Sequence, residues 1–390
     1  MRKICFVTGT RAEYGLLSRL MRLVKEDKDL RLQVIATNMH LMPEYGETYK
    51  EIEKDGFTID KKVYMHKPSD DAYGIISSMA EEMQGMNDAL SELKPDILVL
   101  LGDRYEILVA AQVALIHRVP IAHIHGGEVT EGAFDDAIRH SVTKMSSLHF
   151  TSCEEYRHRV IQMGEQPSRV FDVGSLGVEN IKAVSLMTKD ELEASLDFKL
   201  DTQTILVTYH PVTLGGDPAK DIREFLDALD QFKDLKVIFT MPNSDTGRDA
   251  IALAVENYVE KHSNRAKAYT SLGLRRYLST LQFVKAAVGN SSSGIIEVPS
   301  FGIPTLNIGD RQKGRLASKS VVNCGTSKDE VIVGLKLCLS EEMQKAAKTY
   351  ENPYARENKQ RIPADPANLI YQELKNIELA GLNLKTFYDL

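Results

Sequence analysis

Residues 101–140 are rich in acidic, basic and imidazole side chains. They include Asp103, Arg104, Glu106, His123, His125, Glu128, Glu131, Asp135, Asp136, Arg139 and His140. Such groups, when they lie close together, transfer protons and stabilise charge in a reacting molecule. Asp103 also follows a run of aliphatic residues, where a carboxylate is costly to bury unless it is paired or functional. We therefore take this stretch as the candidate catalytic region.

Two apolar runs, residues 96–101 and 119–124, are predicted to position these side chains. Apolar runs of this length with turn residues at their ends are typical of buried parallel strands. In an open α/β sheet, ligands bind outside the carboxyl ends of the strands. Residues 102–104 and 125–128 directly follow the two runs, so we expect them to lie at the ligand-binding edge of one sheet.

Structural roles compete for the same residues. Asp103 is a possible N-cap of the helix predicted to follow it, and Asp135 or Asp136 is a possible N-cap of the next one. Arg139 and His140 lie one turn farther on, where they either belong to the site or form ion pairs on the helix surface. Asp103 and whichever of Asp135 and Asp136 does not cap its helix are the candidate site residues, and Arg139 and His140 are given a role in support or at an interface.

The second half of the chain has a candidate phosphate site in GNSSSGIIEVPSFG, which begins at residue 289. A predicted strand ends in Gly-Asn, a helix is predicted from about residue 293, and Glu297 is placed to accept hydrogen bonds from ribose hydroxyls. Free amides and hydroxyls at a helix N-terminus bind phosphate groups. Ser291 or Ser292 is equally a helix N-cap. Both roles hold together if one serine caps the helix and the other binds the ligand.

Further polar turns follow other predicted strands. Arg11, in GTRAEYG, either contacts a phosphate at the first helix N-terminus or is a solvated loop residue. The turn lacks G-x-G-x-x-G, so a dinucleotide cofactor is not predicted. In the second half, His210 and the turn at 241–247 each follow a strand, and a cation at His210 would neutralise a leaving diphosphate. Arg311 and Arg315 follow another strand of that half.

Strand and helix patterns alternate along the chain, which predicts an α/β protein with parallel sheets and helices on both faces. The predicted strands are 3–9, 30–37, 96–101, 119–124, 148–152 and 169–174, then 204–210, 236–242, 267–270, 286–290, 304–309 and 320–325. A polar stretch at 185–203 separates the halves. We predict two Rossmann-like, doubly wound domains facing a central cleft, with limits 1–184 and 185–365. A C-terminal helix lies in 366–390, and a single helix is predicted over 328–347.

The length, net charge and cysteine spacing of the chain exclude some classes of protein. A chain of 390 residues favours two domains, and the net charge of −7 argues against a nucleic-acid partner. The cysteines at 5, 153, 324 and 338 have no metal-binding spacing, and Cys5 and Cys338 are expected to be small buried residues. No apolar run is long enough to span a bilayer, and the N-terminus enters a strand without a signal peptide. We predict a cytoplasmic protein that needs no metal or cofactor.

Several of these stretches together resemble the UDP-N-acetylglucosamine 2-epimerase family. The resemblance is to its hydrolysing branch, which forms N-acetylmannosamine for sialic acid synthesis. The matching segments are TGTRAEYG, MH-x3-EYG-x-TY at 39–49, LGDRYE, HIHGGE, DDAIRHSVTKMS, YHPVT, GNSSSGIIE and IGDRQKGR. The resemblance implies a GT-B-like pair of domains, a C-terminal helix that crosses back to the first domain, and a homo-oligomer, dimer or tetramer. We expect the apolar face of helix 136–145 to form a subunit interface.

The resemblance also implies roles for particular residues. Those lining the UDP site are Arg11, His210, Asn243, Ser291, Ser292, Glu297 and Arg311, and those lining the sugar site are His40, Asp103, Arg104, His125, Glu128 and Asp135. Many members carry a glutamate in place of His125, so either His125 or Glu128 is expected to do the proton transfer of that glutamate. Residue 38 is Asn here, where the family pattern has glycine.

The implied reaction converts UDP-N-acetylglucosamine and water to N-acetylmannosamine and UDP. A base removes the C2 proton as UDP leaves, giving a 2-acetamidoglucal, after which water adds at C1 and a proton returns to the other face of C2. We assign Asp103 and Asp135 as acid and base, assisted by His125. Arg11 and His210 would stabilise the departing diphosphate.

Alternatives stay open at this point. The same reaction on UDP-N,N′-diacetylbacillosamine differs only in groups at C4 and C6 of the sugar. The DDAIRH and GDRQKGR segments favour the hydrolysing branch over a non-hydrolysing epimerase. A two-domain retaining glycosyltransferase would need an acceptor groove, and the many carboxylates disfavour a non-catalytic sugar-nucleotide sensor.

Overall fold

The computed structural model describes residues 1–66, 69, 71–131, 133–212, 216–245, 247–355 and 365–390. Parts of the predicted turns at 209–213 and 241–247 lie outside the described residues. The chain forms two compact units. Unit 1 comprises Met1–Glu128, Asp135–Glu179 and Arg356–Leu390, and unit 2 comprises Val129–Phe134 and Asn180–Ala355. The limits and roles that the sequence assigns to the two domains stay predictions.

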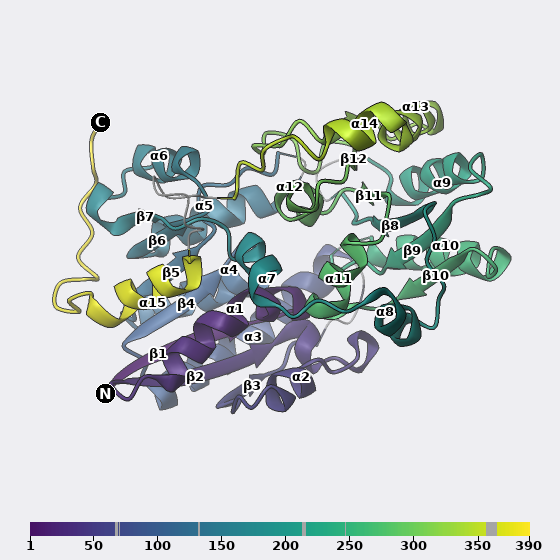
Figure 1. Cartoon of the computed structure of the whole chain (residues 1–390). Coiled ribbons are helices and arrows are strands. Elements are labelled where there is room, and N and C mark those ends of the chain that lie inside the picture. Colours follow the sequence, from purple (N-terminus) through teal and green to yellow (C-terminus); the bar gives the residue numbers. More distant parts are fainter. Residues whose placement is uncertain (67–68, 70, 132, 213–215, 246, 356–364) are drawn as a thin grey trace. The chain divides into compact units, whose positions relative to one another are not determined.

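Unit 1 is built on a seven-stranded sheet (Figure 1). Its strands are β1 (Arg2–Thr8), β2 (Leu30–Thr37), β3 (Lys61–Val63), β4 (Ile97–Leu101), β5 (Ile121–Ile124), β6 (Leu148–Thr151) and β7 (Val170–Asp172). They are parallel throughout and follow the order β3-β2-β1-β4-β5-β6-β7. The order reverses direction at β1 and β4, so the turns after these strands lie at the switch point where doubly wound sheets bind ligands.

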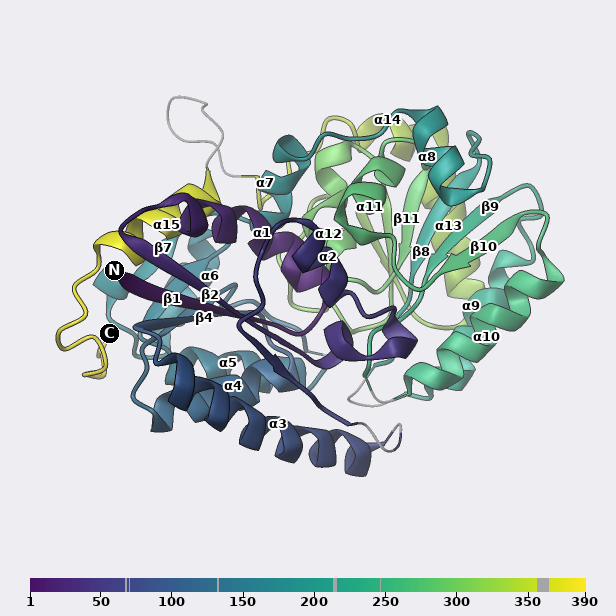
Figure 2. The same ribbon diagram turned by 90° about the horizontal axis from the view of Figure 1, so that it is seen from below.

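Helices connect the strands of unit 1 and cover both faces of its sheet. They are α1 (Arg11–Glu26), α2 (Tyr49–Lys54), α3 (Ala72–Leu93), α4 (Tyr105–Ile116), α5 (Asp135–Met145), α6 (Glu154–Gln162) and α15 (Pro366–Asn376), with 3-10 turns η1 (Asn38–Leu41), η2 (Pro43–Tyr45) and η3 (Pro167–Arg169). Figure 2 shows α3, α4 and α5 on one face, and α1 with α15 on the other. The division between the units falls within α7 (Leu176–Ala183).

The core of unit 1 forms where apolar side chains of α1 meet the sheet and α15. Leu17, Leu20 and Met21 of α1 are fully buried against β1, and Ile370 and Leu374 of α15 join the same cluster. Fully burying an aliphatic side chain of this size contributes roughly 1.5–3 kcal/mol. The last helix of the chain is therefore part of the first unit's core.

Polar contacts fix α15 in this place. The guanidinium of Arg2 donates to the carbonyls of Leu374, Lys375 and Ile377, which satisfies the free carbonyls at the helix C-terminus. At the other end, Arg19 of α1 pairs with Asp365, the N-cap of α15. The two ends of the polypeptide are thereby joined in one unit.

Unit 2 is a second parallel sheet, of six strands. Its strands are β8 (Thr204–Thr208), β9 (Lys236–Thr240), β10 (Ala266–Tyr269), β11 (Ala286–Gly289), β12 (Thr305–Ile308) and β13 (Val321–Cys324), in the order β10-β9-β8-β11-β12-β13. Its helices are α8 (Lys189–Leu196), α9 (Pro218–Leu229), α10 (Arg248–Lys261), α11 (Gly273–Leu281), α12 (Ser293–Ile296), α13 (Lys328–Leu339) and α14 (Glu341–Ala346), with η4 (Val298–Phe301). The order reverses at β8 and β11, which places a second switch point beside α12.

The α/β class with doubly wound parallel sheets is as predicted, but two elements differ. The sequence analysis missed β3, whose Lys-Lys-Val has a single apolar residue. The helix predicted over 328–347 is two helices, because Ser340 has an extended backbone and its hydroxyl accepts a hydrogen bond from the Met343 amide to start α14. Cys5 and Cys338 are buried, as expected, and the four cysteines are free. Within the described ranges, no helix is both long and apolar enough to cross a membrane.

Candidate active site

An ion pair between Asp103 and Arg139 lies at the switch point of unit 1. Asp103 follows Gly102, which takes a left-handed backbone (φ +80°) at the end of β4. The helix α4 begins at Tyr105 with Arg104 at its N-cap, so Asp103 does not have the capping role that was its structural alternative. Its carboxylate instead accepts a hydrogen bond from Nη2 of Arg139.

Arg139 organises the surroundings of this pair. Its side chain is only 1% exposed, although it carries a permanent charge. Nη1 donates to the carbonyl of Glu128 at 2.9 Å and to Oδ1 of Asp136 at 3.3 Å. The guanidinium therefore joins the turn after β4, the turn after β5 and the start of α5. The sequence analysis gave Arg139 a supporting role and did not predict its contact with Asp103.

The turn after β5 places His125 and Glu128 side by side. His125 is a non-glycine residue with φ +66°, a conformation that costs energy and is concentrated at functional sites. Its Nδ1 lies 3.5 Å from Oε1 of Glu128, which also accepts a hydrogen bond from Ser152 at 2.9 Å. Both side chains are buried. The two groups are within ion-pair distance when the imidazole is protonated. Which of them does the work of the family glutamate stays a prediction.

Asp135 opens α5, one turn before Arg139, and is buried. Its neighbour Asp136 contacts Arg139 and lies 3.5 Å from Nε2 of His140. Burial lowers the pKa of His140, while the Asp136 carboxylate opposes that shift. The start of α5 thus presents two carboxylates, of which Asp135 is buried and Asp136 is partly exposed.

Unit 1 also contains three buried glutamates, Glu13, Glu106 and Glu82. Glu13 of α1 accepts hydrogen bonds from the amides of Gly9 and Thr10, and its pKa is raised to about 8 by burial and then by Glu106. Glu106 of α4 is fully buried and accepts from Nε of Arg104 at 2.7 Å. Arg104 thereby has a carboxylate partner inside unit 1. The sequence analysis did not single out this cluster.

Glu82, on α3, is the third member of the cluster. It is fully buried, and burial, followed by the charge of Glu106, raises its pKa well above the ordinary value of 4.5. The folded protein therefore holds a proton on Glu82 at pH values where the unfolded chain has lost it. That linkage makes the folded state less stable as pH rises above about 4.5, until the pKa of the folded state is passed.

Glu82→Gln is expected to remove this loss of stability. Glutamine has the shape of the protonated acid and binds no proton, so the variant gains stability relative to wild type with rising pH. The gain approaches about 1.4 kcal/mol for each pH unit. Urea unfolding at about pH 5 and about pH 8 measures it. Glu81→Gln, on an exposed neighbour in α3, controls for the loss of a carboxylate. An equal effect of Glu82→Gln at both pH values would contradict the assignment.

Two residues predicted near the substrate make internal contacts in unit 1. Arg11 opens α1 and pairs with Glu51 of α2. His40 is fully buried, and its ring nitrogens lie 3.1 Å from Oγ1 of Thr8 and 2.8 Å from Oγ1 of Thr48. Burial lowers the pKa of His40 to about 3, so its ring is neutral. Their contacts with substrate stay predictions.

Asn38 explains one departure from the family pattern. It starts η1 with φ +47°, the left-handed region that glycine adopts freely and asparagine tolerates better than most residues. Asparagine therefore preserves the turn that carries His40.

In unit 2, Asn290 forms hydrogen bonds with two of the predicted phosphate-binding residues, His210 and Arg311. Its side chain accepts from the amide of His210 at 2.7 Å and donates to the His210 carbonyl at 2.8 Å. Its own carbonyl accepts from Nη1 of Arg311 at 3.2 Å and from Nε2 of Gln312 at 2.9 Å. Asn243, after β9, has its amide 3.5 Å from Nδ1 of His210. Asn290 and Gln312 were missed in the sequence, although Gly-Asn at a strand end is a signal for them.

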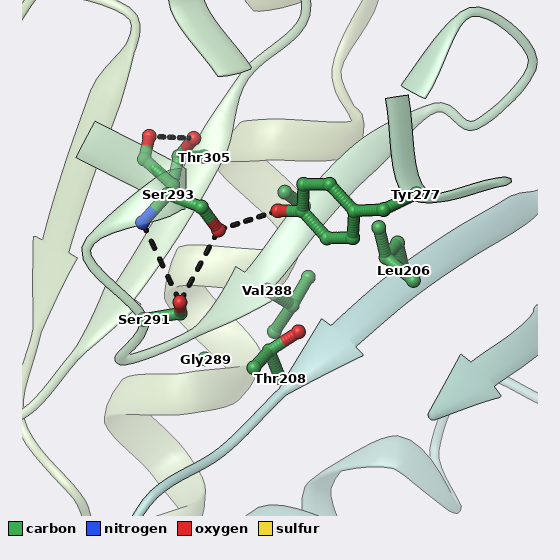
Figure 3. A pocket seen from close by; sticks show the side chains of 10 residues that line it. Leu206, Thr208, Tyr277, Val288, Gly289, Ser291, Ser293 and Thr305 are labelled. Carbon is green, nitrogen blue, oxygen red and sulfur yellow. Dashed lines mark hydrogen bonds between the residues drawn. The ribbon is translucent and has the colours of Figure 1, made fainter. Parts of the chain in front are cut away.

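The serine turn lies beside a small pocket (Figure 3). Oγ of Ser291 is 3.4 Å from the amide and 3.2 Å from the hydroxyl of Ser293, whose hydroxyl also contacts the Tyr277 hydroxyl. Ser292 occupies the N-cap position of α12 without a capping hydrogen bond from its side chain. Glu297 follows at the C-cap, one turn along. The pocket lining joins these serines to the ends of β8 and β11.

The described part of the chain holds no group of three or more His, Cys, Asp or Glu side chains placed to bind a metal ion. The functional groups at the two switch points are carboxylates, imidazoles and a guanidinium in unit 1, and hydroxyls, an imidazole and a guanidinium in unit 2.

Comparison with known proteins decides the family. The family model described as UDP-N-acetylglucosamine 2-epimerase matches residues 22–362. The chain belongs to the UDP-N-acetylglucosamine 2-epimerase family. The epimerase is 44% identical to the "GDP/UDP-N,N'-diacetylbacillosamine 2-epimerase (hydrolyzing)" of Campylobacter jejuni, over 100% of this chain and 99% of that protein. It is 40% identical to the polysialic acid biosynthesis protein P7 of Escherichia coli, over 100% of this chain and 98% of that protein.

The epimerase shares its fold with solved structures of this family. The S. aureus MnaA–UDP co-structure superposes with a TM-score of 0.79 at 18% identity, over all of both chains. The GT-B-like fold expected from the sequence is thus confirmed. The epimerase is an enzyme of the hydrolysing type that acts on a sugar nucleotide.

Proposed function

We propose that the epimerase converts UDP-N-acetylglucosamine and water to N-acetylmannosamine and UDP. The observation that carries this proposal is the Asp103–Arg139 ion pair beside the His125–Glu128 turn. A carboxylate oriented by an arginine, next to a second pair of acid–base side chains, is the arrangement that removal and return of the C2 proton requires. We place the product in sialic acid synthesis, as the sequence resemblance implies.

The reaction is proposed to run in two balanced steps. In the first, a base takes the proton from C2, the C1–O bond breaks, and its electron pair leaves with UDP, giving the 2-acetamidoglucal. In the second, the electron pair of the C1=C2 double bond takes a proton from an acid on the opposite face of C2, the oxygen of water bonds to C1, and a base takes the proton that the water loses. The base and acid exchange protons with solvent, so no oxidant or reductant is consumed.

Asp103 is the proposed base. Its carboxylate accepts a hydrogen bond from the guanidinium of Arg139, which fixes its orientation. Asp135 is the proposed acid partner, with the His125–Glu128 pair assisting proton transfer. A carboxylate in this position also stabilises positive charge on the sugar as UDP departs.

Unit 2 is proposed to bind the UDP group. The hydroxyls of Ser291 and Ser292 suit a diphosphate, Glu297 suits ribose hydroxyls, and Asn290 holds His210 and Arg311 together. The proposed ligands of UDP are His210, Asn243, Ser291, Ser292, Glu297 and Arg311 in unit 2, with Arg11, His40 and Arg104 as proposed substrate contacts in unit 1.

UDP-N,N′-diacetylbacillosamine is the second candidate substrate. It is favoured by the name of the C. jejuni relative, which is 44% identical over the whole chain, while the name of the E. coli relative favours the sialic acid route. Both candidates undergo the same chemistry at C1 and C2. The groups on C4 and C6 distinguish them.

Incubation with each UDP-sugar in deuterated water tests the reaction and the substrate together. We expect free UDP and a C2-inverted sugar that carries deuterium at C2, both followed by NMR, with the higher kcat/KM identifying the natural substrate. A GDP-linked sugar is assayed in parallel, because the name of the C. jejuni relative includes GDP as well as UDP. Interconversion of two UDP-sugars without release of UDP would overturn the hydrolytic proposal.

We also propose a cytoplasmic homo-oligomer, a dimer or tetramer, although the expected interface must change. Ile138 and Val142 of α5 are buried within unit 1, so that apolar face is already covered. Ile76 of α3 and Ile116 of α4 are instead well exposed. Sedimentation as a monomer at working concentrations would contradict this part of the proposal.

A further inference from the structure

His123 makes two directional hydrogen bonds from inside the sheet of unit 1. It is a fully buried residue of β5. Its Nε2 lies 2.8 Å from the carbonyl of Gly102, and because a carbonyl only accepts, Nε2 carries the proton. Its Nδ1 lies 3.1 Å from Oγ1 of Thr143. Burial lowers the pKa of His123 to about 3, so Nδ1 is deprotonated and accepts from the threonine hydroxyl.

Both hydrogen bonds lead to groups at the candidate site. Gly102 directly precedes Asp103, and its amide also donates to Ile124 of β5, so both polar groups of its backbone are bound to that strand. Thr143 lies on α5, four residues after Arg139. The imidazole of His123 thus connects the turn that carries Asp103 with the helix that carries its ion-pair partner.

The turn after β5 packs against the hydrogen-bonded side chains of His123 and Thr143. A Cβ placed on Gly126 would lie 3.1 Å from Nδ1 of His123 and 3.0 Å from Oγ1 of Thr143, closer than almost all real contacts. Glycine at 126 therefore lets the backbone between His125 and Glu128 lie directly against the His123–Thr143 pair. Three segments of the site converge on one neutral ring.

We propose that His123 is a positioning residue for the epimerase: its ring fixes the Gly102 turn and α5 relative to each other, and so holds Asp103 in contact with Arg139. This rests on the function proposed for Asp103. Because the reacting atoms must be aligned closely, a shift of about 1 Å in a catalytic group can cost about 10²-fold in rate. His123 does not touch substrate in this scheme.

The neighbouring strand offers a matched control. His149 of β6 is the direct strand partner of His123 and is equally buried. Its Nε2 contacts Glu165, at 2.9 Å, rather than a turn of the site. Replacing His149 therefore removes a buried imidazole and its hydrogen bond without releasing the Gly102 turn. Loss of stability is common to both positions, whereas loss of positioning is specific to His123.

Steady-state kinetics of His123→Leu, His123→Gln and His149→Gln test the proposal. We expect His123→Leu to lower kcat about 10²-fold with KM little changed. His123→Gln keeps an N–H donor for Gly102 and recovers much of that loss. His149→Gln lowers the melting temperature but leaves kcat near wild type. Equal kcat for His123→Leu and His123→Gln would overturn the proposal. So would a loss of kcat in His149→Gln as large as that in His123→Leu, because it would show that kcat follows stability alone.

Two further measurements keep the outcome decisive. If His123→Leu does not fold, Thr143→Val removes only the donor to Nδ1, and we expect a smaller loss of kcat with KM unchanged; wild-type kcat in this variant would then overturn the proposal. Asp103→Asn is assayed in parallel. If it retains activity, the function proposed for Asp103 fails, whereas an inactive Asp103→Asn beside an active His123→Leu defeats the positioning role alone.

Discussion

Asp103→Asn is expected to lower kcat by about 10²–10⁴-fold, the usual contribution of a positioned acid or base. Asparagine has nearly the shape of aspartate, but it cannot accept the C2 proton. It also gives Arg139 a neutral partner in place of a charged one. The loss should appear in both kcat and kcat/KM, because the missing interaction is made in the transition state.

The matched control for this variant is Asp96→Asn. Asp96 stands at the opposite end of the same strand, where its carboxylate accepts the amide of Lys3 at 2.7 Å. Its replacement changes the charge of the same strand without touching the carboxyl edge. We expect wild-type kcat for Asp96→Asn and an unaltered affinity for UDP in both variants. Turnover near wild type in Asp103→Asn would show that another group is the base.

Arg139→Met is expected to lower the free energy of unfolding by about 3 kcal/mol and to abolish measurable turnover. The guanidinium is almost entirely buried, and its removal takes a partner from Asp103, from Asp136 and from the carbonyl of Glu128. Arg139→Lys keeps the charge but not the planar fork, so we expect it to be intermediate. Chemical unfolding at pH 7 and kinetics at saturating substrate measure the two effects.

Arg159→Met controls for the loss of an arginine near the same turn. Arg159 of α6 donates to the carbonyl of Gly127 at 2.6 Å, but its side chain is 28% exposed. We expect a cost of only about 1 kcal/mol there. In a double-mutant cycle, Asp103→Asn with Arg139→Met should cost less than the sum of the single changes, because both remove the same ion pair. Additive effects would mean that the pair is not coupled in solution.

The fold was largely predictable because buried parallel strands are short apolar runs with turns at their ends. That signal identified β4 and β5 and, with them, the edge where Asp103, His125 and Glu128 lie. It could not identify β3, an edge strand that offers one apolar side chain. Nor could it divide α13 from α14, since Ser340 is unremarkable until its backbone is seen to be extended.

The site was less predictable than the fold because its main contacts join residues that are far apart in the sequence. Arg139 reaches Asp103 across 36 residues, whereas its spacing to Asp136 suggested a pair on the helix surface. Asn290 acts through its side chain on His210, 80 residues away. His123 looked like any polar residue in a strand, and only the position of the Gly102 carbonyl reveals what its ring binds.

The docking of α15 on α1 has a consequence for synthesis of the chain. Unit 1 is discontinuous, since its core needs Ile370 and Leu374, whereas unit 2 ends at Ala355. As the polypeptide leaves the ribosome, all of unit 2 emerges before the helix that completes unit 1. The apolar face of α1 stays uncovered during that interval, so we expect unit 1 to be more prone to aggregation during synthesis than unit 2.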